Sequence, residues 1–183
     1  MTAVLLATLL GVVLAVSLTA WWHHGRWWNR GPILPAVAVG LLCAAIIIAA
    51  SAGAVGRPAL ILCAALAVSA SAVGGGPLTV AVLQLASAST RPRTREPGRP
   101  DPTPAEDVLR GGTWIGVLER LAVTAALIAG WPEGIAVALA VKGLARYPEM
   151  RSPGAGASER FIIGTFTSVM WAAACAVTFL LLR

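Results

Sequence analysis

Three charged residues interrupt apolar stretches of this sequence, where a charge is chemically conspicuous. Glu119 and Arg120 are adjacent within the run 112–131, and Lys142 lies in the following apolar run. A lone charge at the centre of a membrane-spanning helix costs about 2.5–3.5 kcal/mol on insertion scales, so such residues are usually paired, near an interface or functional. A carboxylate close to cationic groups can form an ion pair, exchange a proton or help to bind an anion.

An antiparallel helical hairpin would bring these charges together. If the chain turns at Trp131 and Pro132, residues whose numbers sum to about 263 lie at equal depth on the two helices. Glu119 is then level with residue 144, within one helical turn of both Lys142 and Arg146. The spacing therefore predicts a Glu119–Lys142 ion pair, or a three-membered cluster that includes Arg146.

Two interpretations of this cluster stay open from the sequence. In the structural one, a buried ion pair near the cytoplasmic boundary sets helix register, while Arg120 and Arg146 extend to lipid headgroups. In the functional one, the charges line a polar pocket for an anionic ligand, a lipid headgroup or a proton. Glu159 and Arg160, at the start of the last apolar run, are secondary candidates for the same site.

The composition places these charges in a membrane protein. Hydrophobic residues make up 57% of the 183 residues, charged residues only 12%, and the mean hydropathy is +0.79. These values exceed what a soluble domain of this length needs for its core. The sequence therefore predicts an all-α fold, a polytopic membrane helical bundle.

Apolar runs predict about six transmembrane helices. They are expected at 2–20, 33–55, 59–76 with a kinked extension over 78–88, 114–130, 133–147 and 159–182. Most approach the roughly 20 residues that cross a bilayer, whereas 59–89 is too long for one crossing. The Gly-Gly-Gly-Pro stretch at 74–77 is expected to end the third helix or to kink it.

The chain divides into three parts by composition. Residues 1–89 form an N-terminal three-helix half, and residues 112–183 form a C-terminal three-helix module. Between them, residues 90–111 are rich in proline and arginine and predict a cytoplasmic linker, because they offer little apolar surface for a core. A capping box at Thr103 predicts a short surface helix in this linker that ends at Gly111 and Gly112.

The chain has a net charge of +6, and the position of its arginines in the loops explains this basic excess. With six crossings, one side of the membrane receives ten arginines, at 26, 30, 91, 93, 95, 99, 110, 146, 151 and 160, and the other side receives those at 57 and 183. The positive-inside rule then places both termini outside and the basic loops in the cytoplasm. Nucleic acid is not an expected partner, because acidic residues are interspersed in the linker and no aromatic residue there can stack on bases.

Metal, cofactor and catalytic motifs are not expected in this chain. The cysteines at 43, 63 and 175 fall in apolar runs without zinc-type spacing and are interpreted as buried thiols. His23 and His24, flanked by tryptophans, are interpreted as part of an interfacial aromatic belt. No phosphate loop, H-E-x-x-H or nucleophile elbow occurs.

The charged residues also carry a family resemblance. The stretch 112–120, then Lys142 with Arg146, then 159–165 with Ser168, resembles a family of small bacterial integral-membrane proteins defined as a domain of unknown function. The resemblance covers about 112–176, with glycine at 143 and tyrosine at 147 where serine and phenylalanine are expected. It implies a shared helical module in a bacterial inner membrane, and no particular chemistry.

These observations predict a non-enzymatic integral membrane scaffold or accessory subunit. Its expected partners are the lipid bilayer, anionic lipid headgroups that the basic linker would contact, and another membrane protein. The alternative is a small transporter or carrier whose polar intramembrane site contains Glu119, Lys142 and Arg146.

Overall fold

The computed structural model describes residues 2–22, 32–90, 109–150 and 157–183, and this part of the chain is helical without strands. The helices are α1 (Thr2–Trp22), α2 (Ile33–Ser51), α3 (Arg57–Thr90), α4 (Leu109–Ile128), α5 (Glu133–Met150) and α6 (Ala157–Leu180). The predicted all-α helical bundle is confirmed.

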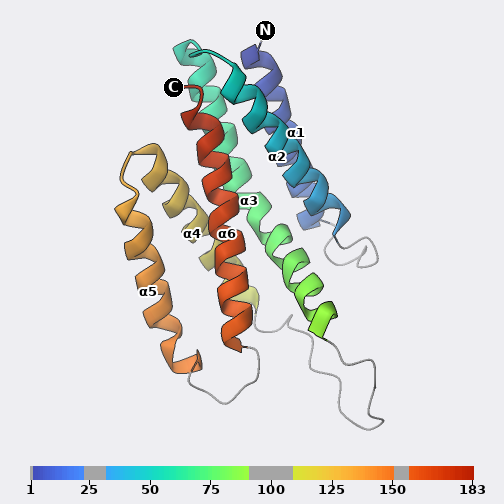
Figure 1. Ribbon diagram of the computed structural model, residues 1–183, viewed down its shortest axis with the longest axis vertical. Helices are drawn as coiled ribbons and strands as arrows, with labels where there is room; N and C mark the ends of the chain where they lie inside the picture. The colour runs from blue at the N-terminus through green and yellow to red at the C-terminus, as the bar shows by residue number, and fades with distance from the viewer. Residues whose placement is uncertain (1, 23–31, 91–108, 151–156) are drawn as a thin grey trace.

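Successive helices run in opposite directions, and the N- and C-termini lie at the same end of the bundle (Figure 1). α3 and α6 are central: α3 packs against α1, α4 and α6, and α6 also packs against α2 and α4. α5 lies at the side of the bundle and packs mainly on α4 (Figure 1). Helices from the N-terminal half and the C-terminal module therefore share one bundle.

Four of these helices, α1, α2, α3 and α6, are long and apolar enough to cross a membrane, judged on the described residues. α3 has 34 residues, which corresponds to about 51 Å of helix against a hydrocarbon core of about 30 Å. Its length is therefore sufficient for one crossing and an extension beyond it.

Expected and observed helix ends differ most at two glycine-rich stretches, and the helix predicted at 33–55 ends earlier, at Ser51. The chain stays helical through the Gly-Gly-Gly-Pro stretch at 74–77, so the extension is the second part of α3 and Pro77 lies inside the helix. α4 begins at Leu109 and continues through Gly111 and Gly112, which were expected to end a separate surface helix. A glycine or proline in a helix lowers its intrinsic stability, but tertiary packing of the flanking residues can override that preference.

The α4–α5 connection has the geometry of a helix C-cap followed by a new helix. Gly130 has a φ of 72°, a conformation that glycine adopts without steric strain. The amide of Trp131 donates to the carbonyl of Ala126 at 2.8 Å, the long-range bond of a Schellman motif. Pro132 and Glu133 follow and start α5, so the hairpin turns where the sequence predicts.

The core lies among α1, α2, α3 and α6. Its buried apolar side chains include Leu6, Leu10, Val13, Leu42, Cys63, Trp171, Cys175 and Leu182. At one end of the bundle, the amide of Val55 donates to the carbonyl of Leu182 at 3.3 Å and joins the α2–α3 connection to the end of α6. Cys63 and Cys175 are buried as expected, but Cys43 is exposed on the outer face of α2, so the interpretation of a third buried thiol is wrong.

Candidate functional site

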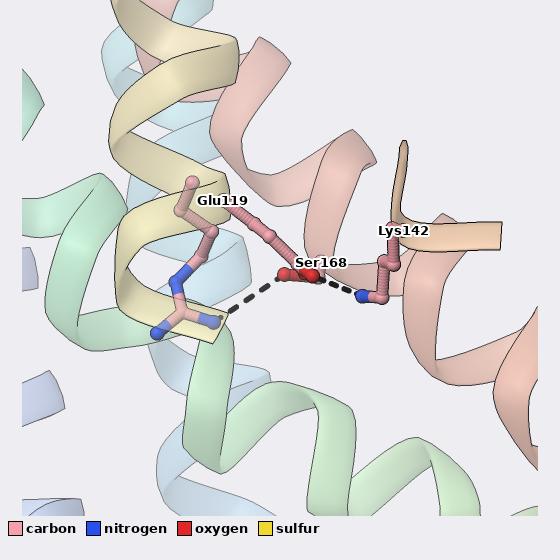
Figure 2. Close-up of polar contacts among 4 residues, drawn as sticks. Glu119, Lys142 and Ser168 are labelled. Carbon is pink, nitrogen blue, oxygen red and sulfur yellow. Dashed lines mark hydrogen bonds and ion pairs between the residues drawn. The ribbon is translucent and has the colours of Figure 1, made fainter. Parts of the chain in front are cut away.

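Glu119 of α4 and Lys142 of α5 form a salt bridge through carboxylate Oε2 and ammonium Nζ (Figure 2). The hairpin register predicts this pair, because the Gly130–Pro132 turn places the two positions within one helical turn of the same depth. Both side chains keep about a fifth of their surface exposed, at 20% and 21%. The pair therefore lies between the two helices near the surface of the bundle, where each group neutralises the other.

Phe161 on the second turn of α6 provides a further contact to the lysine. The Lys142 ammonium lies 5.6 Å from the centroid of the Phe161 ring. A cation over an aromatic face is attracted by the quadrupole of the ring, and the attraction grows when water is excluded. The side chain of Lys142 thus connects α5 to both α4 and α6.

Arg120 occupies a different environment from its neighbour Glu119. Only 4% of the residue is exposed, and its guanidinium donates to the Ala72 carbonyl of α3 through Nε at 3.1 Å and Nη2 at 2.6 Å. Its Nη1 donates to the Ser168 hydroxyl of α6 at 3.3 Å, which is the second dashed contact in Figure 2. The expectation that Arg120 extends to lipid headgroups is wrong, because backbone and hydroxyl acceptors inside the bundle satisfy its donors.

Glycines in α3 make room for this arginine and for a neighbouring tryptophan. A Cβ at Gly75 would lie 2.4 Å from Cδ and 2.9 Å from Nε of Arg120. A Cβ at Gly74 would lie 2.4 Å from Cζ2 of Trp171. Real Cβ atoms do not approach other atoms this closely, so the glycines serve as contact points for side chains from α4 and α6.

Two tryptophans also donate to carbonyls of the same part of α3. Nε1 of Trp171 donates to the Ala70 carbonyl and Nε1 of Trp21 to the Val73 carbonyl, each at 3.0 Å. The Val73 carbonyl has no α-helical amide partner, because position 77 is proline and has no N–H. Such a carbonyl is costly in a membrane unless another donor reaches it, and Trp21 supplies that donor.

A chain of hydroxyl groups continues from this site toward the core. The hydroxyls of Ser71 and Thr124 are 2.7 Å apart, and Thr124 also donates to the Ala172 carbonyl at 3.5 Å. All three residues are buried. Small polar side chains therefore join α3, α4 and α6 one turn away from Arg120.

The remaining candidate residues do not join this cluster among the described contacts. Glu159 and Arg160 are exposed on the first turn of α6 and are not partners of Glu119, Arg120 or Lys142. The side chain of Arg146 lies outside the described residues, so the three-membered cluster stays a prediction. The histidines at 23 and 24, the capping box at Thr103 and the loop arginines at 26, 30, 91, 93, 95, 99 and 151 also lie outside the described residues.

Several partners in the site could not be recognised from the sequence. The Ala72 carbonyl carries no signal in its residue type, and Trp171 and Phe161 read as ordinary apolar residues of a spanning helix. Three consecutive glycines next to a proline were the available signal. Their local effect predicts a helix end or a kink, whereas in the structure α3 continues through them and they mark the close approach of Arg120 and Trp171.

Comparisons of the chain with protein-family models, with curated proteins and with solved structures find no match. The function proposed below therefore depends on the contacts of the charged residues within the bundle.

Proposed function

We propose that this chain is a non-enzymatic integral membrane scaffold or accessory subunit, and that its charged residues hold the bundle in one register. The observation that carries the proposal is that the intramembrane charges are engaged within the chain. Lys142 neutralises Glu119, and acceptors on α3 and α6 occupy Arg120. Charges that are paired or hydrogen bonded inside a helical bundle specify which helices meet and at what depth.

The proposed setting is a bacterial inner membrane with both termini outside and the basic loops in the cytoplasm. The common position of the two termini at one end of the bundle supports placing both on one side of the membrane (Figure 1), and the distribution of arginines supports that side being the outside. Trp21, near the end of α1, contacts α3 one residue from the Ala72 carbonyl that binds Arg120. Because tryptophans concentrate at membrane interfaces, the charged residues would lie near the cytoplasmic boundary.

A scaffold or accessory subunit requires a partner, which we propose is another integral membrane protein. Crosslinking in native membranes followed by purification in mild detergent tests this directly. We expect one other membrane protein to be recovered with this chain in stoichiometric amounts. The same purification from membranes of cells lacking this chain should not recover that protein. Recovery of this chain alone, from membranes in which it is folded, would contradict the proposal.

A small carrier is the second candidate, because Glu119 and Lys142 retain partial exposure rather than being sealed in the core. In a carrier, Glu119→Gln and Lys142→Met would each abolish flux of the transported ion and leave protein abundance unchanged. In a scaffold, Lys142→Met would lower abundance, since it leaves a carboxylate without its counterion. Proton and phosphate uptake into proteoliposomes, measured together with abundance in membranes, separates the two.

A further inference from the structure

Residues 74–77 of α3 combine two local features that weaken a membrane helix. Three consecutive glycines lower the intrinsic stability of the helix relative to alanine, and Pro77 removes the amide that would bind the Val73 carbonyl. Sharp changes in helix direction occur at such positions. α3 nevertheless continues through them as one helix.

Side chains from three other helices bind α3 directly beside this segment. Trp21 of α1, Arg120 of α4 and Trp171 of α6 donate to the carbonyls of Val73, Ala72 and Ala70. Those three carbonyls lie within four consecutive positions that precede the glycines. Neighbouring helices therefore hold α3 at the turn that leads directly into its weakest segment.

The residue next to Arg120 carries a second acceptor for a guanidinium. Glu119 directly precedes Arg120 on α4, and a carboxylate is a stronger acceptor for guanidinium than a backbone carbonyl. In the structure, Lys142 occupies that carboxylate instead. The ion pair between α4 and α5 thus leaves Arg120 available to the Ala72 carbonyl.

We propose that residues 74–77 form a hinge in α3, that Arg120 and Trp21 latch it, and that the Glu119–Lys142 pair controls the latch. When Lys142 is bound to Glu119, Arg120 holds the Ala72 carbonyl and the two parts of α3 keep one relative direction. When that pair opens, Glu119 draws Arg120 away from α3 and the hinge is released. Opening of the ion pair between α4 and α5 thereby changes the direction of α3, which α5 reaches through Glu119 and Arg120.

The state of the hinge is measured as the distance between two spin labels, one on each part of α3, by double electron–electron resonance in lipid nanodiscs. Ile61 and Leu85 are suitable positions because they are 70% and 59% exposed and lie on either side of the hinge. Along a straight helix they would be about 36 Å apart, which is within the measurable range. Cys43 is exposed and is replaced by alanine, whereas the buried Cys63 and Cys175 stay in place.

The labelled parent should give one narrow distance distribution. We expect Arg120→Gln and Lys142→Met each to widen it, and the double variant Glu119→Gln with Lys142→Met to restore the narrow distribution, since no carboxylate then competes for Arg120. Trp21→Phe, which removes only the N–H donor, should widen the distribution even if Arg120→Gln fails to fold. Arg160→Gln, an exposed arginine on α6, is the matched control and should change nothing.

A narrow, unshifted distribution in folded Lys142→Met would overturn the proposed control by the ion pair, and the same result in Trp21→Phe would overturn the latch. A broad distribution in the parent would overturn both, because the hinge would then be unlatched in the native protein. Loss of the widening in the double variant distinguishes release by Glu119 from a general loosening of α5.

Discussion

Among single residues, two adjacent charged side chains on α4 contact different helices. Glu119 points to α5 and is neutralised by Lys142, whereas Arg120 enters the bundle and binds α3 and α6. Neighbouring positions on a helix are rotated by about 100° around its axis, so one dipeptide can contact two different neighbouring helices. The pair stabilises α5 against α4, and the arginine joins α4 to the central helices.

Removal of the lysine charge should destabilise the protein more than removal of both charges. Lys142→Met leaves the Glu119 carboxylate without a counterion, and we expect a loss of about 2–3 kcal/mol in the free energy of unfolding. The double variant with Glu119→Gln should lose clearly less. Unfolding by SDS in mixed micelles measures the loss in Lys142→Met, in Glu119→Gln and in the double variant. A loss in the double variant equal to the sum of the two single losses would show that the pair is not coupled.

Alanine at residue 75 should be poorly tolerated. Because its Cβ would lie 2.4 Å from Cδ of Arg120, Gly75→Ala must displace that side chain or the helix. Overpacking of this kind costs about 1–3 kcal/mol. Gly40→Ala on α2 is the matched control, since nothing lies within 4 Å of its Cβ. Equal melting temperatures for the two variants would contradict the close packing described here.

At the scale of helices, α3 is organised by donors that come from outside it. Trp21, Arg120 and Trp171 bind carbonyls of one turn, and the absent side chains of Gly74 and Gly75 let two of them approach. The same glycines that weaken the helix in isolation therefore create its tertiary contacts. This explains why a sequence typical of a helix end lies inside a continuous helix.

The indole donor of Trp171 should contribute measurably to this arrangement. Trp171→Phe removes the bond to the Ala70 carbonyl and part of a buried side chain, so we expect the free energy of unfolding to fall by about 2 kcal/mol. Trp114→Phe on α4 is the comparison, because Trp114 is 71% exposed. The free energies of unfolding of the two variants are compared by following tryptophan fluorescence during unfolding. Equal values would show that the Trp171 donor is unimportant.

At the scale of the whole molecule, the antiparallel order of the helices brings both termini to one end of the bundle (Figure 1). The peripheral position of α5 means that it is held through α4, the Glu119–Lys142 pair and Phe161. The rest of the bundle is connected through α3 and α6. A perturbation of the charged pair should therefore affect α5 first.

The proposed orientation predicts the labelling of single cysteines by a membrane-impermeant maleimide. In a Cys43→Ala background, Thr2→Cys and Arg183→Cys should react in intact cells. Arg95→Cys, in the linker, should react only after the membrane is opened, because its loop is proposed to be cytoplasmic. Reaction of Arg95→Cys in intact cells would reverse the proposed orientation.

Composition and the lengths of the apolar runs were sufficient for the all-α fold class, the approximate helices and the turn at Trp131 and Pro132, because these depend on local sequence. The Glu119–Lys142 pair also followed from the sequence, since a short turn leaves little freedom in the register of a hairpin. The helix end predicted as one alternative at residues 74–77 is absent from the structure, because glycine has the same local effect whether it ends a helix or admits a neighbouring side chain.

The direction of Arg120, the exposure of Cys43 and the continuity of α3 are set by how the helices pack against one another. Each depends on which helix lies alongside, and residues distant in the sequence supply that neighbour: Ala72 for Arg120 and Ala70 for Trp171, 48 and 101 positions away. Local sequence determines that a buried donor needs an acceptor, because an unpaired one is costly in hydrocarbon. Which acceptor it finds is determined by the packing of the whole bundle.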